Sequence, residues 1–135
     1  MQNFLKPIIV ISLFKLLIGS FFASEDTYRW FIPFVDYFVT NFDNPWQYFY
    51  NIGETMAFPY GPVMLYPLAL VTLILSPLAF IFGSSLPLIS LSLTLLLFDL
   101  GIYFLLIKLL EGYERKVFYL YFCSPLVFYI NYIYT

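Results

Sequence analysis

The sequence predicts an all-α integral membrane protein, with three to four transmembrane helices and amphipathic juxtamembrane helices in the first outer loop. One observation is the composition. Of the 135 residues, 62% are hydrophobic, 24% aromatic and only 10% charged, and the mean hydropathy is +0.87. A water-soluble domain has about 25% charged residues, so this chain has too little charge to cover a surface that faces water. The other observation is that long apolar segments flank one polar stretch.

Charge and residue types exclude several classes of function. The net charge is -2, and Arg115-Lys116 is the one basic cluster, so we expect no nucleic-acid partner. Cys123 is the single cysteine, which rules out a disulfide within the chain, and the absence of histidine rules out histidine triads and the usual zinc motifs. Any chemistry must therefore use carboxylates, hydroxyls, amides, arginine or lysine.

Residues 4–22 form the first apolar segment. It reaches the length of about 20 residues that a helix needs to cross roughly 30 Å of hydrocarbon. Ala23-Ser24 loosely suits a signal-peptide cleavage site, but Lys15 interrupts the apolar run in a place that a signal core does not tolerate. We therefore expect a retained transmembrane helix, with a cleaved signal as the alternative.

Residues 24–57 make the one long polar stretch, and we expect them to form an outer loop that carries an amphipathic helix. Apolar residues recur there at spacings of three and four, which predicts one apolar stripe on a helix lying on the membrane surface. They are Tyr28, Phe31, Ile32, Val35, Phe38, Val39 and Phe42. Pro33 either kinks this helix or begins a second one. Asn44-Pro45 and Asn51-Ile52-Gly53 are expected to be turns.

The remaining apolar sequence divides at its turn signals into residues 58–82, 86–107 and 117–135. Cytoplasmic loops are enriched in Lys and Arg, which here lie at the amino end, with Lys6, and in the segment KLLEGYERK. If both lie inside, the chain between them crosses an even number of times, so one crossing follows the first helix. We assign it to residues 86–107. The proline-rich residues 58–82 then form a re-entrant or interfacial segment, with an ordinary crossing as the alternative, and residues 117–135 form a further transmembrane helix directed outward.

Four segments now stand in a particular order along the chain. They are SEDTYRWFIPFVDYF after the first helix, FPYGPVMLY from Phe58 to Tyr66, LLLFDLGIYFLLIKLL from Leu95 to Leu110, and SPLVFYINYIYT from Ser124 to Thr135. In this order they resemble the amino-terminal part of the GT-C superfamily, the polytopic glycosyltransferases that take sugars from polyprenyl-phosphate carriers. Relatives of the GPI-anchor mannosyltransferases are the most similar in appearance. The resemblance implies that this chain is the amino-terminal part of such an enzyme.

The resemblance also implies a catalytic acid in the first outer loop. Transfer of a sugar from a lipid phosphate to a hydroxyl of a glycan, lipid or protein needs a carboxylate. This carboxylate takes the acceptor proton on the face opposite the leaving phosphate. We assign this role to Asp26, with Glu25 as the second candidate, and direct displacement implies inversion at the anomeric carbon. From spacing alone, Asp26 can instead cap a helix that begins at Thr27.

Arg29, Trp30 and Tyr60 are the candidates for binding substrate. Arg29 can offer a forked donor to a phosphate, and its alternatives are an ion pair with Asp26 or an anchor to lipid head groups. Trp30 offers a ring on which a sugar can stack. We assign no cofactor, and a divalent metal held by Glu25 and Asp26 is the open alternative.

Polar residues inside the apolar segments are expected to be structural. A carboxylate inside a transmembrane helix costs about 3 kcal/mol on insertion scales, so Asp99 should face protein or water. We expect it to pair with Lys15, which lies well inside the first helix. Asn131 is expected to bond between helices or to line the site.

The expected function is a membrane glycosyltransferase, or its amino-terminal piece, in the plasma membrane of a prokaryote or an ER-type membrane. Its catalytic loop would lie on the outer or luminal side, among membrane lipids. Two alternatives stay open: a non-catalytic scaffold subunit and a transporter fragment. The three functions differ in which acidic residue each requires. An enzyme depends on Asp26, a transporter depends more on Asp99, and a scaffold depends on neither.

Overall fold

The structure, a computed structural model, describes residues 5–55, 57–58 and 61–132, and within these ranges it is helical and has no strand. The helices are α1 (Leu5–Gly19), α2 (Ile32–Asn41), α3 (Pro45–Asn51), α4 (Pro62–Leu75), α5 (Ala79–Phe82), α6 (Leu86–Leu109), α7 (Glu114–Val117) and α8 (Pro125–Tyr132). Two π-helical turns, η2 (Thr27–Phe31) and η5 (Phe118–Phe122), and two 3₁₀ turns, η3 (Ser76–Leu78) and η4 (Gly83–Ser85), join them. The expected all-α class is confirmed for the described residues.

One helical run in the described residues, Pro62–Leu109, is long and apolar enough to cross a membrane by its length and composition. It contains α4, α5 and α6. The first apolar segment appears as α1, which has 15 residues in its described part. The number of three to four transmembrane helices stays a prediction.

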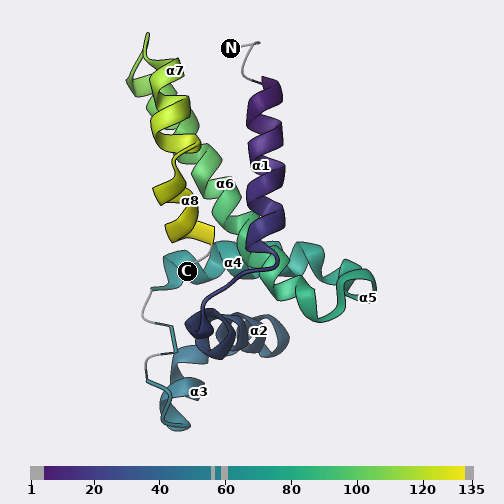
Figure 1. The fold of residues 1–135 in the computed structure, drawn as a ribbon. Helices are drawn as coiled ribbons and strands as arrows, with labels where there is room; N and C mark the ends of the chain where they lie inside the picture. The colour runs from purple at the N-terminus through teal and green to yellow at the C-terminus, as the bar shows by residue number, and fades with distance from the viewer. Residues whose placement is uncertain (1–4, 56, 59–60, 133–135) are drawn as a thin grey trace.

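The helices are arranged around α6, which contacts α1, α4 and α8. Figure 1 shows α1, α6 and the α7–α8 segment running in roughly the same direction, with α2 and α3 at the far end of the molecule from α7. α4 and α5 lie across the lower end of α6 in this view. The chain therefore forms an upright group of helices, α1, α6 and α7–α8, that stands on a layer made of α2 to α5.

α1 and α6 make close contact through small residues. A Cβ atom built on Gly19 would lie 2.7 Å from Ser92 Oγ and 2.9 Å from a ring carbon of Tyr132. The buried face of α6 carries further hydroxyl groups at Ser90 and Thr94. Small residues at such positions allow two helix backbones to approach closely, which is the packing expected of helices in a membrane.

The expected segment 58–82 is not one helix. Pro77 lacks the N–H that would continue the hydrogen-bond ladder of α4, so the chain passes through a 3₁₀ turn into the short α5. Gly83, with φ at +52°, then lets the chain reverse into α6. This short, bent segment has the shape expected of an interfacial hairpin, and its position relative to a membrane stays a prediction.

The expected helix 117–135 is interrupted. After η5 the chain turns at Cys123 and Ser124, and α8 begins anew at Pro125. Proline has no N–H to donate and favours the first turn of a helix, which explains both the break and the restart. The prediction of one continuous helix is therefore wrong for the described residues.

The polar stretch 24–57 forms η2, α2 and α3, which pack on α4 around an aromatic core. Its most buried ring is Phe34, at 1% exposure, which was not in the expected apolar stripe. Tyr28 and Phe42, which were in that stripe, are 52% and 69% exposed. The stripe is shifted because α2 is covered on two sides, by α3 and by α4, and so buries a wider face than a helix lying on a membrane surface.

The turn expected at Asn44-Pro45 is the start of a helix. Asn44 Oδ1 accepts a hydrogen bond of 3.3 Å from the Gln47 amide, and Pro45 occupies the first turn of α3. The turn expected at Asn51-Ile52-Gly53 is confirmed, since α3 ends at Asn51 and Gly53 has φ at +86°.

Candidate functional site

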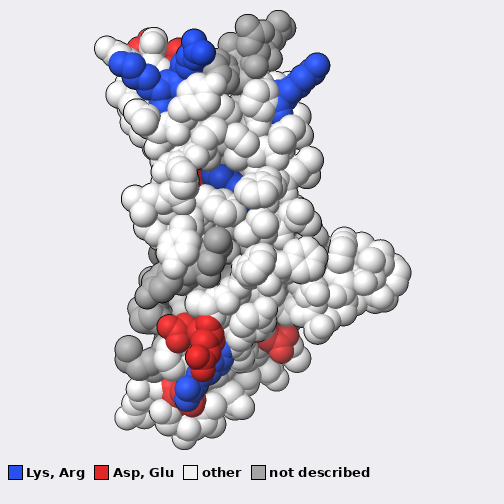
Figure 2. All heavy atoms as spheres, in the orientation of Figure 1, with Lys and Arg blue, Asp and Glu red and all other residues white. Residues whose placement is uncertain are grey.

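Charged groups gather at the two ends of the molecule. Figure 2 shows lysine and arginine at the end that carries α7, and a cluster of acids at the opposite end. The basic residues of the first end are Lys6, Lys108, Arg115 and Lys116, beside which lie Glu111 and Glu114. The polar stretch at the other end carries Glu25, Asp26, Asp36, Asp43 and Glu54, with Arg29. Between the ends the surface in this view is almost free of charge.

Asp26 lies in the first turn of the helix that leads into α2. Helical conformation begins at Glu25, and both acids are exposed. Asp26 makes no side-chain capping bond. The cap is Ser24, whose hydroxyl accepts a hydrogen bond of 3.2 Å from the Thr27 amide. The interpretation of Asp26 as a helix cap is therefore wrong, and its carboxylate is free of that structural role.

The turn after Asp26 is π-helical, and Pro33 accounts for it. Proline cannot donate to the carbonyl of Arg29 four residues earlier, and its ring would clash there. The chain widens instead, so that the Ile32 amide bonds to the Thr27 carbonyl five residues back. Pro33 then lies in the first turn of α2, where proline is tolerated. Pro33 therefore begins a helix, which was one of the two alternatives expected for it.

Arg29 and Trp30 both reach Glu54, which follows α3. The Trp30 Nε1–H donates to Glu54 Oε2 at 3.3 Å, and Arg29 Nη2 lies 3.8 Å from Glu54 Oε1. The alternative ion pair of Arg29 with Asp26 is thus replaced by one with Glu54. The Arg29 and Glu54 side chains are 59% and 42% exposed, so this ion pair contributes little to stability. Its effect is to hold η2 and the segment after α3 together.

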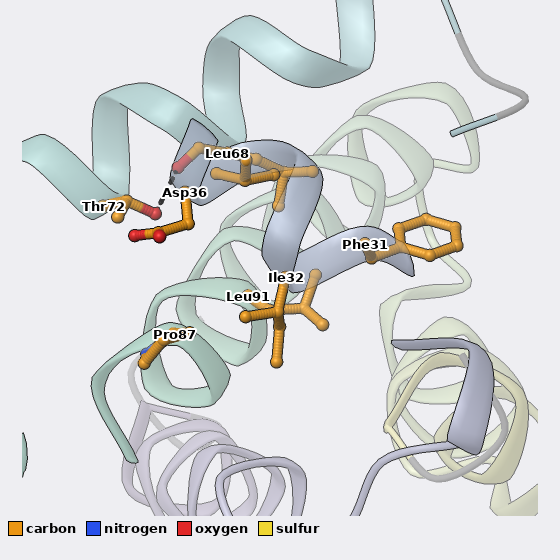
Figure 3. Close-up of a pocket in the computed structure, with 8 residues that line it drawn as sticks. Phe31, Ile32, Asp36, Leu68, Thr72, Pro87 and Leu91 are labelled. Carbon is orange, nitrogen blue, oxygen red and sulfur yellow. Dashed lines mark hydrogen bonds between the residues drawn. The ribbon is translucent and has the colours of Figure 1, made fainter. Parts of the chain in front are cut away.

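A small cavity lies between α2, α4 and α6. Figure 3 shows Asp36 and Thr72 side by side at its polar end, with Ile32 and Leu91 among its apolar walls. The Thr72 hydroxyl is already bonded to the Leu68 carbonyl at 2.9 Å. The cavity measures about 30 Å³, which is the room of one water molecule. It is too small to hold a sugar.

Lys15 and Asp99 form an ion pair in the middle of the molecule, as expected. Their side chains are 2% and 0% exposed. The Tyr132 hydroxyl donates to Asp99 Oδ2 at 3.4 Å, and Lys15 Nζ lies 4.1 Å from the centre of the Phe122 ring. The pair joins α1 to α6, with α8 and η5 covering it. Asn131, half-buried on α8, has a role that stays a prediction.

The structure brings together only part of the expected site. Arg29 and Trp30 meet at Glu54, whereas Tyr60 lies outside the described residues. The described residues contain no group of three or more His, Cys, Asp and Glu side chains that could hold a metal ion, so Glu25 and Asp26 have no third ligand there. The sequence contained no signal for the role of Glu54, because it lies 24 residues from Trp30 and outside any periodic pattern.

Comparison of the chain with family models, curated proteins and solved structures finds no match in any of the three.

Proposed function

We propose that the chain is a membrane glycosyltransferase of GT-C type, or the amino-terminal part of one. It would transfer a sugar from a polyprenyl-phosphate carrier to a hydroxyl acceptor, with Asp26 as the general base. The observation that supports this proposal best is the charge distribution. The acids of residues 24–57 and the cations near Lys6 and α7 lie at opposite ends of the molecule (Figure 2), with an almost uncharged surface between them.

This distribution fits a protein that spans a membrane with its cations inside. Lysine and arginine favour the cytoplasmic side, so the α7 end would face inward and Asp26 would face the outer or luminal side. α1, α6 and the segment from α7 to α8 would be the crossings, and α4 with α5 would lie at the outer interface. In this orientation, Asp26 would lie near the depth of lipid phosphates and within reach of acceptors in water.

The role proposed for Asp26 is to accept a proton. As the acceptor hydroxyl attacks the anomeric carbon, its proton passes to the carboxylate, and the carbon–oxygen bond to the lipid phosphate breaks on the opposite face. Asp26 is exposed and free of the capping bond, so both carboxylate oxygens can meet an acceptor. Arg29 would bind the phosphate, because more than half of its side chain is exposed despite the Glu54 contact.

The test compares two Asp→Asn variants of the full-length protein in its own membrane. In Asp26→Asn, transfer of labelled sugar from a panel of polyprenyl-phosphate sugars should fall by about 10²- to 10⁴-fold, which is the usual contribution of a general base. Asp43→Asn is the matched control, since Asp43 is an exposed acid of the same loop, and it should keep at least half of the activity.

Both variants should insert into the membrane as the wild type does, measured by carbonate extraction. If Asp26→Asn transfers sugar at the wild-type rate, the catalytic proposal is wrong. A chain that inserts but transfers no sugar in any form would instead favour the scaffold function.

A further inference from the structure

A second cavity opens at the acid end of the molecule, beside α3. Its volume is about 170 Å³. It is lined by Phe34, Trp46, Phe49, Tyr50, Glu54, Thr55, Ala57 and Phe58, and we call it the α3 pocket. We propose that the α3 pocket binds one sugar ring of the hydroxyl acceptor, an inference that rests on the proposed function.

The inner walls of the α3 pocket are aromatic rings that hold one another in place. Phe34 stacks on Phe58 with ring centres 4.7 Å apart, and Trp46 meets Phe34 edge-on at 5.1 Å. Phe49 lies 5.2 Å from Phe34. Phe34, Phe49 and Phe58 are all buried. Because these rings are fixed by their neighbours, a ligand does not have to order them, which lowers the cost of binding.

The polar groups of the α3 pocket are at its mouth. Glu54 and Thr55 are at least partly exposed there. An ionised carboxylate has about four acceptor positions, of which the Trp30 indole occupies one and Arg29 approaches another. The free positions can accept hydrogen bonds from two neighbouring hydroxyls. Trp30 and Arg29 also hold the carboxylate in one orientation, so it is prepared for such a ligand.

Size and chemistry together favour a sugar ring. A closed cavity of about 150 Å³ admits one benzene ring, so the α3 pocket, at about 170 Å³ and open to solvent, has room for one six-membered ring whose hydroxyls extend through the mouth. A pyranose has an apolar C–H face for the accessible rings of Trp46 and Tyr50, which the buried phenylalanines support, and hydroxyls for the Glu54 carboxylate. A quaternary ammonium ion also suits aromatic rings, but the guanidinium of Arg29 already lies 3.8 Å from Glu54 and would repel a second cation.

The position of the α3 pocket relates it to Asp26. Trp30, which donates to Glu54, lies one turn after Asp26 on the same helical segment. A sugar ring bound at Glu54 would therefore be held beside the segment that carries the proposed base. The role assigned to Glu54 is binding and positioning of the acceptor, and proton transfer stays with Asp26.

The test measures binding by saturation-transfer NMR on the full-length protein in lipid nanodiscs, with no sugar donor present. The probes are the methyl glycosides of mannose, glucose and galactose, and tetramethylammonium represents the alternative ligand class. Glu54→Gln should weaken binding of at least one glycoside by 10-fold or more. It keeps an oxygen for the Trp30 bond, so the fold should survive, which circular dichroism checks. Asp36→Asn, an exposed acid outside the α3 pocket, should bind as the wild type does.

Three results would overturn the proposal: no glycoside binds, Glu54→Gln binds glycosides as the wild type does, or tetramethylammonium alone binds through Glu54. The experiment also separates the two proposals. Asp26→Asn should still bind the glycoside, because Asp26 does not line the α3 pocket. Binding without any transfer would leave the α3 pocket correct and the proposed function wrong, whereas Asp26-dependent transfer without glycoside binding would mean the reverse.

Discussion

Replacement of Lys15 by methionine should lower the free energy of unfolding by about 3 to 5 kcal/mol. This is the usual cost when one partner of a buried ion pair is removed and the other charge is left without compensation. The full cost applies here because the Lys15 and Asp99 side chains are 2% and 0% exposed, so water cannot solvate the remaining carboxylate. Within the part of the chain that the structure describes, this carboxylate keeps the Tyr132 hydroxyl at 3.4 Å, which is long for a bond between oxygens, and a contact with the Tyr121 hydroxyl. Neither carries the positive charge that Lys15 supplied.

The opposite change, Asp99→Asn, should cost less, at about 2 to 3 kcal/mol. The orphaned ammonium keeps the Phe122 ring, 4.1 Å from Nζ, and a desolvated cation–π contact of this kind contributes roughly 2 kcal/mol. The asparagine also keeps an oxygen that Lys15 can approach. The double variant Lys15→Met, Asp99→Leu should lie within about 1 kcal/mol of the wild type, because apolar replacement of both partners removes the desolvation cost with the pair.

Denaturant titration in mixed micelles, followed by circular dichroism, measures these differences, and the single variant Asp99→Leu completes a double-mutant cycle with Lys15→Met. Lys15→Met and Asp99→Leu on their own should together cost several kcal/mol more than the double variant. The reasoning is refuted if each single variant costs less than 1 kcal/mol, or if the two costs simply add in the double variant. Either result would mean that Lys15 and Asp99 are solvated or apart in the protein.

One substitution tests the packing of α1 on α6, and one pH titration tests the loop before α7. Gly19→Ala should destabilise the protein by about 1 to 3 kcal/mol in the same titration, since its Cβ would lie 2.7 Å from Ser92 Oγ; a neutral effect would mean that α1 and α6 are farther apart. The backbone N–H groups of Glu114 itself and of Gly112 hold the pKa of the Glu114 carboxyl below its usual range. The hydrogen bonds from these N–H groups to the carboxylate therefore order the loop above pH about 4.3. They are lost as the pH falls through the lowered pKa, and an NMR titration of the Glu114 carboxyl measures this pKa.

The sequence predicted the features of this fold that depend on composition and on unpaired charge. The helix expected at residues 86–107 is found as α6, Leu86–Leu109, because this long apolar run contains no proline after Pro87. The contact of Lys15 with Asp99 was also predictable. An ammonium and a carboxylate within apolar segments must find partners, and each was the obvious partner for the other.

The features that it did not predict depend on contacts between distant residues. The core position of Phe34 depends on α3 and Phe58, which pack against it from outside the local sequence. The bond from Trp30 to Glu54 links residues that are 24 positions apart. Helical periodicity reports one exposed and one covered face, so it cannot describe a helix such as α2 that is covered by two neighbours.

The two π-helical turns add a local contribution to these differences. A widened turn displaces every following side chain from the positions that a period of 3.6 predicts, and η2 and η5 both precede a proline-associated helix start. After η2 the covered face shifts to Phe34, and Trp30 on η2 itself reaches Glu54. At η5 the turn ends with Phe122 against Lys15. Both departures from a regular helix thus lie next to a charged group. At η5 this group is the buried Lys15, whose role is structural, whereas at η2 the neighbouring charged groups are exposed. Residues 25–31 together with Glu54 are therefore the strongest candidates for function.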